Sequence, residues 1–203
     1  MTTLTAAKKY ASKGWAVIPV HSVTASNACS CGVLFDLIDN KTHGMGKLPY
    51  TEHRHKDASK DESQIDAWWS QFPDPNVAIA TGAVSGFVVL DIDKKNEGLK
   101  SLDYLERRYG KLPTTPKVHS GGGGLHFYFK HPGIELRGRR GMLPGIDVQA
   151  DGGAIVAPPS NHKLGTVYKW DDYQNEDSVP LAPLPHWLLR MIKHKIKIEK
   201  IPG

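Results

Sequence analysis

The longest apolar run in the chain lies around Gly86 to Leu90 and leads directly into the acidic sequence Asp91-Ile-Asp93. A run this short cannot cross a membrane, and its Phe, Val and Leu residues are typical of a buried strand. Because side chains alternate along a strand, Asp91 and Asp93 are expected on one face and their apolar neighbours on the other. The segment therefore predicts a buried sheet in which one strand ends with two carboxylates.

Two carboxylates at a strand end repel each other unless a positive group neutralises them. A hard divalent cation such as Mg²⁺ or Mn²⁺, which prefers oxygen ligands, would do so. The Asp-x-Asp pattern is short, however, and also occurs where both acids cap a turn or face water. Asp91 and Asp93 alone leave both interpretations open.

Four consecutive glycines lead into a second strand, between Ser120 and Lys130. Glycines leave backbone N–H groups unobstructed, which suits a triphosphate, and His126 and Lys130 would add a donor and a charge. Alternation places His126, Tyr128 and Lys130 on one face of this strand, opposite a core face. The core face would hold Leu125, Phe127 and Phe129. A flexible hairpin loop beside a partly buried histidine is the alternative.

A third acidic segment follows between Gly145 and Gly153. Strand alternation would present Asp147 and Gln149 on one face, whereas Asp151-Gly152 is a turn signal. A third carboxylate from a neighbouring strand would complete a two-metal site of the kind that serves in-line phosphoryl transfer.

Positive charge is concentrated in one window of the sequence. The chain has 26 Lys and Arg against 21 Asp and Glu, giving +5, and residues 111–145 alone carry that +5. Such a stretch attracts polyanions, with nucleic acid or nucleotide phosphate the obvious candidates. A solvated loop with excess Lys and Arg is the alternative. The basic residues of the window are Lys111, Lys117, Lys130, Arg137, Arg139 and Arg140.

Periodicity and capping signals predict helices and strands that mix without a regular βαβ repeat. We therefore expect an α/β or α+β fold with an at least partly antiparallel sheet, as one globular domain or two small lobes. Ser59 and Glu62 match a capping box at the start of the clearest helix. Helices are expected over residues 5–13, 59–72, 99–109 and 185–195. Strands are expected over residues 15–20, 77–80, 87–93, 125–130, 145–150 and 154–157.

The two cysteines, Cys29 and Cys31, are separated by one residue. They are too close for an easy bridge and too few for a disulfide framework, which fits a reducing, cytoplasmic location. With His43 they offer ligands to Zn²⁺, although two ordinary thiols in a long loop are the alternative. No signal peptide or membrane span is indicated.

The order of these motifs resembles that of the archaeo-eukaryotic primase superfamily. The motifs are Asp-hydrophobic-Asp at residues 87–93, Ser-Gly-rich-His at 120–126 and hydrophobic-Asp at 146–147. The closer resemblance is to the N-terminal primase-polymerase domain of bifunctional replication proteins from plasmids, phages and prophages. Supporting segments lie at residues 14–19, 46–49, 57–69, 76–82 and 157–170, so the resemblance covers roughly residues 13–170.

The resemblance implies an N-terminal α/β unit and an RNA-recognition-motif-like sheet with a cleft between them. Asp91, Asp93 and Asp147 would bind two Mg²⁺ or Mn²⁺ ions. The incoming nucleotide would contact Ser120, Gly121, Gly122, Gly123, Gly124 and His126. Weaker candidates for phosphate or template contacts are Lys47, Lys130, Ser160 and His162, together with Arg137, Arg139 and Arg140 for DNA.

The expected activity is therefore that of a template-dependent nucleotidyltransferase, a DNA primase, a DNA polymerase or both. It would act on a single-stranded DNA template, a primer and nucleoside triphosphates in plasmid or phage replication. Residues 1–190 would form the catalytic domain and residues 191–203 the end of the last helix and a linker, with a helicase domain beyond. The alternatives are a non-catalytic module that binds single-stranded nucleic acid and a metal-dependent nuclease.

Overall fold

The computed structural model of the chain divides into two compact units. The first unit comprises Met1–Ala80 and Ala154–Lys169, and the second comprises Thr81–Gly153 and Trp170–Gly203. The structure describes residues 1–26, 28–32 and 44–198. Within these ranges no helix is both long and apolar enough to cross a bilayer.

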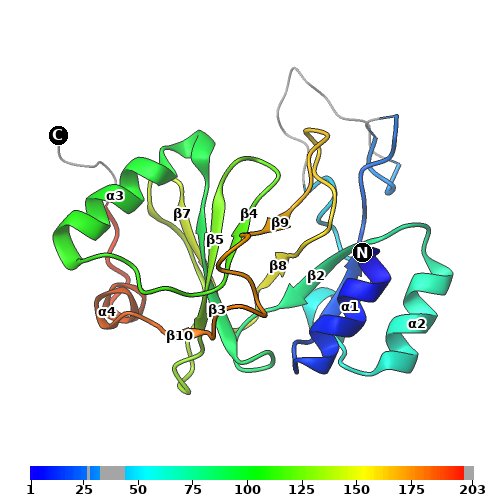
Figure 1. Cartoon of the computed structure of the whole chain (residues 1–203), viewed down its shortest axis with the longest axis horizontal. Coiled ribbons are helices and arrows are strands. Elements are labelled where there is room, and N and C mark those ends of the chain that lie inside the picture. The colour runs from blue at the N-terminus through cyan, green and yellow to red at the C-terminus, as the bar shows by residue number, and fades with distance from the viewer. Residues whose placement is uncertain (27, 33–43, 199–203) are drawn as a thin grey trace. The chain divides into compact units, whose positions relative to one another are not determined.

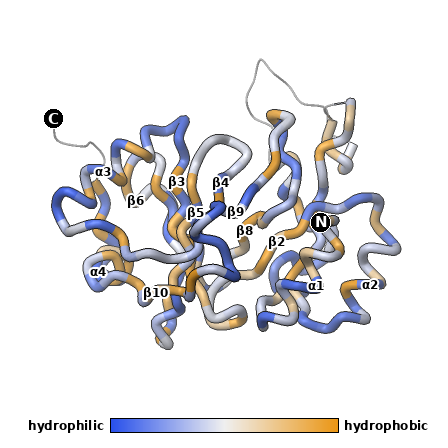
Figure 2. The backbone as a smooth tube through the Cα atoms, viewed as in Figure 1, coloured by the Kyte–Doolittle hydropathy of each residue, from blue (hydrophilic) through white to orange (hydrophobic). Residues whose placement is uncertain are grey.

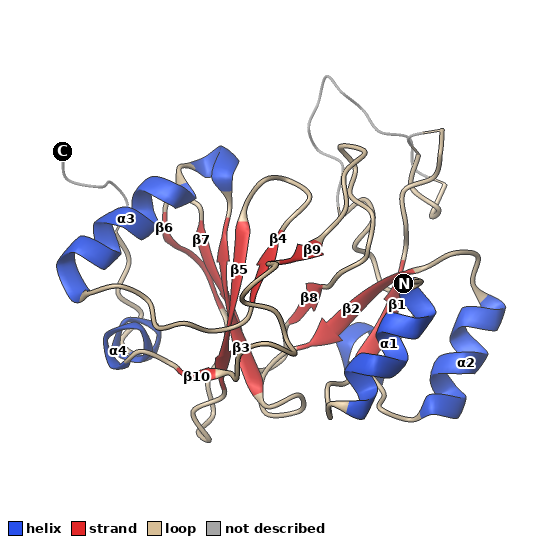
Figure 3. Ribbon diagram, viewed as in Figure 1, coloured by secondary structure: helices blue, strands red, loops and turns tan. Residues whose placement is uncertain are grey.

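A three-stranded antiparallel sheet with two helices forms the framework of the first unit (Figures 1 and 3). Its strands lie in the order β1-β2-β8. Ion pairs from Lys8 to Glu62 (3.0 Å) and Asp66 (2.8 Å) join the two helices. The elements are α1 (Thr3–Ser12), β1 (Val17–Val20), the 3₁₀ helix η1 (Arg54–Asp57), α2 (Glu62–Gln71), β2 (Asn76–Ala80) and β8 (Ala154–Val156).

The start of α2 differs from the prediction. Asp61 is the N-cap residue, and its carboxylate accepts a hydrogen bond from the Ser63 N–H (2.8 Å). The Ser59 hydroxyl instead accepts from the Asp61 N–H (3.0 Å), two residues before the helix. The capping box of Ser59 and Glu62 is therefore wrong, because the acid immediately before the first turn already satisfies an unpaired N–H group.

The second unit is built on a seven-stranded sheet, with six strands in the order β6-β7-β3-β5-β4-β9. β4 pairs with the first half of β5, and β10 pairs in parallel with its last two residues. The pairings of β3, β4, β6 and β7 are antiparallel, as predicted. The strands are β3 (Phe87–Ile92), β4 (Lys117–His119), β5 (Leu125–Lys130), β6 (Arg139–Leu143), β7 (Ile146–Gln149), β9 (Lys169–Trp170) and β10 (Ala182–Pro183).

One face of this sheet carries the core of the second unit. Helices α3 (Gly98–Tyr109) and α4 (His186–Lys193) supply Leu102, Leu105, Leu188 and Met191 to that core. Hydrophobic residues are concentrated along the strands that they cover (Figure 2). The apolar cluster from the strands is Val88, Leu90, Ile92, Phe129, Ile146 and Val148. Alternation then turns the remaining side chains of β3, β5 and β7 to the opposite face.

Only some of the apolar residues of α3 are buried. Leu99 and Tyr109 are 41% and 40% exposed, so Leu102 and Leu105 form its buried apolar face. The Tyr109 ring stacks on Trp187 of α4, with ring centroids 5.2 Å apart. Aromatic stacking thus holds the half-buried Trp187 at the rim of the core.

Truncating the fully buried Leu188 should destabilise the second unit. Leu188→Ala removes a side chain with 0% exposure and leaves a cavity, so we expect the free energy of unfolding to fall by about 2–5 kcal/mol. Urea denaturation measures the loss. Leu99→Ala on the exposed side of α3 is the matched control, with a loss under about 1 kcal/mol. Equal losses for both variants would contradict this assignment of the core.

Candidate active site

The strand register brings the three predicted acids to one end of the same sheet face. Asp91 on β3 lies directly opposite Asp147 on β7. The Asp93 N–H donates to the Gly145 carbonyl (2.8 Å), which continues the same pairing beyond the strand end. Directly opposed residues have Cβ atoms about 5 Å apart and diagonal neighbours are about 7–8 Å apart. Asp91 and Asp147 therefore lie side by side on the face turned away from α3 and α4, and Asp93 follows at the end of β3.

His126 lies beside Asp91 on the other neighbouring strand. Its position on β5 is directly opposite Asp91, and the His126 Nε2 atom is 3.4 Å from the Asp91 Oδ1 atom. The His126 side chain is 5% exposed and lies on the acid-bearing face. Asp91 is thus flanked by a second carboxylate from β7 and by an imidazole from β5.

Protein donors hold two of the carboxylates. Asp93 caps the 3₁₀ helix η2 (Lys94–Asn96), accepting from the Lys95 N–H (2.9 Å) and from Asn96 Nδ2 (2.6 Å). Asp147 Oδ1 accepts from the Gly141 N–H (2.6 Å). Gly141 lies at a register shift in β6 and has a φ of +60°, a conformation that glycine adopts readily. The irregularity in β6 thereby directs a backbone donor at Asp147.

This donor set suits a divalent cation by its chemistry. Carboxylate oxygens are the ligands that Mg²⁺ and Mn²⁺ prefer. Among the described residues, however, no three His, Cys, Asp or Glu side chains are close enough to hold an ion in their present conformations. Asp93 and Asp147 are turned toward the N–H donors named above, so rotation of their side chains would have to accompany metal binding.

The glycine loop is a closed turn rather than the open phosphate cradle expected from its sequence. The Gly123 N–H donates to the Ser120 carbonyl (2.9 Å), and the Gly124 N–H donates to Ser120 Oγ (3.0 Å). A Cβ atom on Gly124 would clash with the Ile92 carbonyl oxygen, so no other residue fits there without a shift of the backbone. The Ser120 hydroxyl and two of the glycine N–H groups are therefore already bonded within the turn.

A charged cluster that the sequence analysis did not identify anchors the strand before this turn. Asp171 Oδ2 pairs with Lys117 Nζ (3.0 Å) and His119 Nε2 (2.9 Å) of β4. Burial alone would raise the pKa of the Asp171 carboxyl, but hydrogen bonds from His119 and Lys117 outweigh it and hold that pKa well below its usual range. His119 immediately precedes Ser120, so the cluster fixes one end of the glycine loop.

Several other predicted residues of the second unit lie apart from this site. Lys130 is at the far end of β5 from the glycine loop, about 13 Å beyond His126 at the usual rise per residue. Arg139 donates to the carbonyls of Met191 (3.2 Å) and Ile196 (3.0 Å) at the end of α4, which is a structural role. Arg137 is exposed and pairs with Glu135 (3.3 Å), and Arg140 is exposed. DNA contacts by Arg137 and Arg140 stay predictions.

Asp151 has the structural position that its turn sequence predicts. It accepts hydrogen bonds from the Leu136 and Ala83 N–H groups, both at 2.8 Å. Burial opposes ionisation of Asp151, but these two bonds and the neighbouring His131 outweigh it and lower its pKa.

Three predicted phosphate contacts belong to the first unit. Ser160 is fully buried, and its hydroxyl bonds both the N–H (3.0 Å) and the carbonyl (3.1 Å) of Val77 on β2. A hydroxyl held in this way supports the sheet, and a phosphate contact by Ser160 stays a prediction. His162 is 8% exposed and packs edge-on against Tyr168, and Lys47 is exposed in a turn.

The cysteine prediction is corrected in part. Cys29 and Cys31 form a disulfide, with Cα atoms 5.0 Å apart, although one intervening residue seemed too short a separation for an easy bridge. In this state neither sulfur is a thiolate that binds zinc. His43 lies outside the described residues, so zinc binding by the reduced cysteines stays a prediction.

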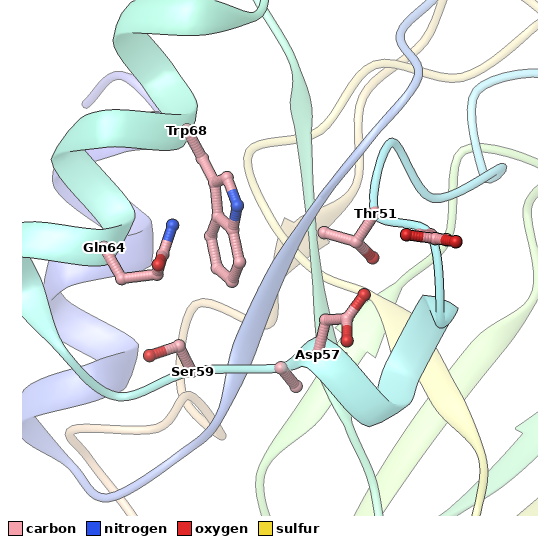
Figure 4. A pocket seen from close by; sticks show the side chains of 7 residues that line it. Thr51, Asp57, Ser59, Gln64 and Trp68 are labelled. Atoms are coloured by element: carbon pink, nitrogen blue, oxygen red, sulfur yellow. The ribbon is translucent and has the colours of Figure 1, made fainter.

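A polar pocket in the first unit contains none of the predicted site residues. Trp68 and Gln64 of α2 point into it, facing Asp57 and Thr51 (Figure 4). The other aromatic residue of the pair, Trp69, donates through Nε1 to Thr3 Oγ1 (3.0 Å) in α1. Trp68 thus forms one edge of the pocket, whereas Trp69 joins α2 to α1.

Comparison with known families identifies the class of protein. The sequence profile described as "bifunctional DNA primase/polymerase, N-terminal" matches residues 7–187, and the chain belongs to this family. Membership assigns it generally to the DNA primases and polymerases, nucleotidyltransferases whose substrates are DNA and nucleotides. A comparison with curated proteins gave no significant match.

Removing the Asp171 carboxylate should change how stability depends on pH. A carboxyl whose folded pKa is depressed stabilises the fold above its unfolded pKa of about 3.9, and this contribution is lost as the pH falls toward the folded pKa. We expect Asp171→Asn to lower the free energy of unfolding at pH 7 and to flatten its decline below about pH 4. Urea denaturation across pH 2.5–7 tests this, with the exposed Asp103→Asn as control. Parallel curves for Asp171→Asn and the unaltered protein would disprove it.

Proposed function

We propose that the chain is a template-dependent nucleotidyltransferase that joins nucleoside triphosphates on single-stranded DNA. The observation that supports this most directly is the position of Asp91 between Asp147 and His126, with Asp93 at the same strand end. Family membership supports the general activity, whereas metal use and the template are our inferences. The family resemblance also motivates a role in plasmid or phage replication and a helicase domain as partner.

Asp91, Asp93 and Asp147 would hold one or two Mg²⁺ or Mn²⁺ ions once their side chains rotate from their present donors. Such ions supply charge neutralisation at the triphosphate and lower the pKa of an attacking 3′-hydroxyl. His126, whose Nε2 atom lies 3.4 Å from the Asp91 Oδ1 atom, would help to orient that carboxylate. The glycine turn lies beside the end of β3, where Gly124 packs against the Ile92 carbonyl, and its glycines would contact the triphosphate.

Clustered carboxylates argue against a module that only binds nucleic acid. Phosphates dominate the affinity of proteins for single strands, and uncompensated carboxylates repel them. Three acids on one sheet face would therefore weaken such binding unless cations offset them. A nuclease would use similar ligands, so the direction of the reaction has to be measured.

Incubation with a primed template, labelled nucleotides and Mg²⁺ or Mn²⁺ separates the three functions. We expect extension of the primer, whereas an unchanged primer would indicate a binding module and a shortened one a nuclease. Asp147→Asn keeps an acceptor for the Gly141 N–H but removes the charge, and should slow extension about 100-fold or more.

Asp103→Asn is the matched control, because Asp103 is an exposed acid of α3 that pairs with Arg107 (2.7 Å). It should extend primers at the rate of the unaltered protein. Circular dichroism and thermal unfolding would establish that both variants are folded. A folded Asp147→Asn variant with an unchanged extension rate would remove Asp147 from the catalytic machinery.

A further inference from the structure

Lys94 extends across the end of β3 onto the glycine loop. Lys94 is the first residue of η2 and lies two residues beyond the last β3–β5 pair, Ile92 with Leu125. A Cβ atom on Gly123 would lie 3.3 Å from Lys94 Cδ and 3.9 Å from Lys94 Nζ. The stem of Lys94 therefore packs against the glycine backbone, with its ammonium group at the loop.

The backbone that carries Lys94 is held at both ends. Asp93 caps it through Lys95 and Asn96, as described above, and the Gly98 N–H donates to the Asp93 carbonyl (2.9 Å). Gly98 is itself required, since a Cβ there would lie 2.5 Å from the Gly145 carbonyl oxygen. The turn that aims Lys94 at the loop is thus determined by residues adjoining the acid group.

Gly123 provides the space into which Lys94 fits. It has a φ of +79°, which disfavours a side chain, and the bare Cα atom admits the aliphatic stem of the lysine. An ammonium group on such a stem keeps donors directed outward while its methylene groups cover the backbone. The result is a cation beside a glycine turn, one residue from Asp93.

We propose that Lys94 is a substrate-binding residue that contacts the phosphates of the incoming nucleotide, an inference that rests on the proposed function of this site. A lysine ammonium group is a compact positive charge with three donors, and bonds of this kind to phosphate are among the stronger hydrogen bonds in proteins. Lys94 takes the part of phosphate ligand that the sequence suggested for Lys130, which lies at the other end of β5. Lys94 binds and orients the phosphates of the nucleotide, and it transfers no proton.

The test compares three folded variants in two measurements. Calorimetry with inorganic tripolyphosphate and Mg²⁺ reports phosphate binding without nucleotide transfer, and primer extension reports KM and kcat for the nucleotide. Lys94→Ala should weaken tripolyphosphate binding and raise KM on the order of tenfold, with a smaller effect on kcat. Lys94→Arg should keep most of the tripolyphosphate affinity and a KM near that of the unaltered protein, because it keeps the charge.

Lys95→Ala is the matched control, since it removes the same charge from the next residue of η2 and should change either value less than about twofold. Equal tripolyphosphate affinities for Lys94→Ala and the unaltered protein would overturn the assignment of Lys94, as would equal weakening by Lys95→Ala or no binding at all. Lys94-dependent tripolyphosphate binding without primer extension would support the phosphate contact and refute the proposed polymerisation. Primer extension with a KM that does not change in Lys94→Ala would support the proposed polymerisation and refute the phosphate contact.

Discussion

The pairing of β3 with both β5 and β7 is the constraint on which the second unit depends. Because side chains alternate along each strand, one register places Leu90 and Ile92 in the core and Asp91 opposite both His126 and Asp147. A slip of one residue would bury the acids against α3 and α4. Burial of the apolar residues under these helices therefore also fixes the geometry of the candidate active site.

The candidate site combines closely packed backbone with carboxylates that are held by neighbouring donors. Glycines allow the close backbone contacts around it, as at Gly124 against the Ile92 carbonyl. The carboxylates of Asp93 and Asp147 meanwhile bond to neighbouring N–H groups, which offsets their mutual repulsion. In the proposed function, exchanging those donors for a cation would require side-chain rotation but no change of strand register.

Strands and helices could be predicted from the sequence, because they depend on local periodicity. Contacts between residues that are far apart in the chain could not. The strand over residues 125–130 is confirmed, because alternation is a local property. Burial does not follow the predicted faces, since His126 and Tyr128 are buried whereas Leu125 and Phe127 are only half-buried. Asp171 could not be predicted, since its partner His119 is 52 residues away and joins it only across the sheet. Ser160 resembled a phosphate ligand, but only the tertiary structure reveals that its hydroxyl bonds to Val77. The roles of the three acids remain predictions that follow from their shared position.

The contacts at the end of α4 also cover one edge of this sheet. β6 is an outer strand, and an open strand edge is a template for pairing with other chains. Arg139 donates to the carbonyls of Met191 and Ile196, and the Ile198 N–H donates to the Met142 carbonyl of β6 (3.0 Å). The segment that follows α4 thus covers part of this strand edge. Its loss would expose β6 to pairing with other chains, and would favour self-association before it disturbed the acids on the sheet.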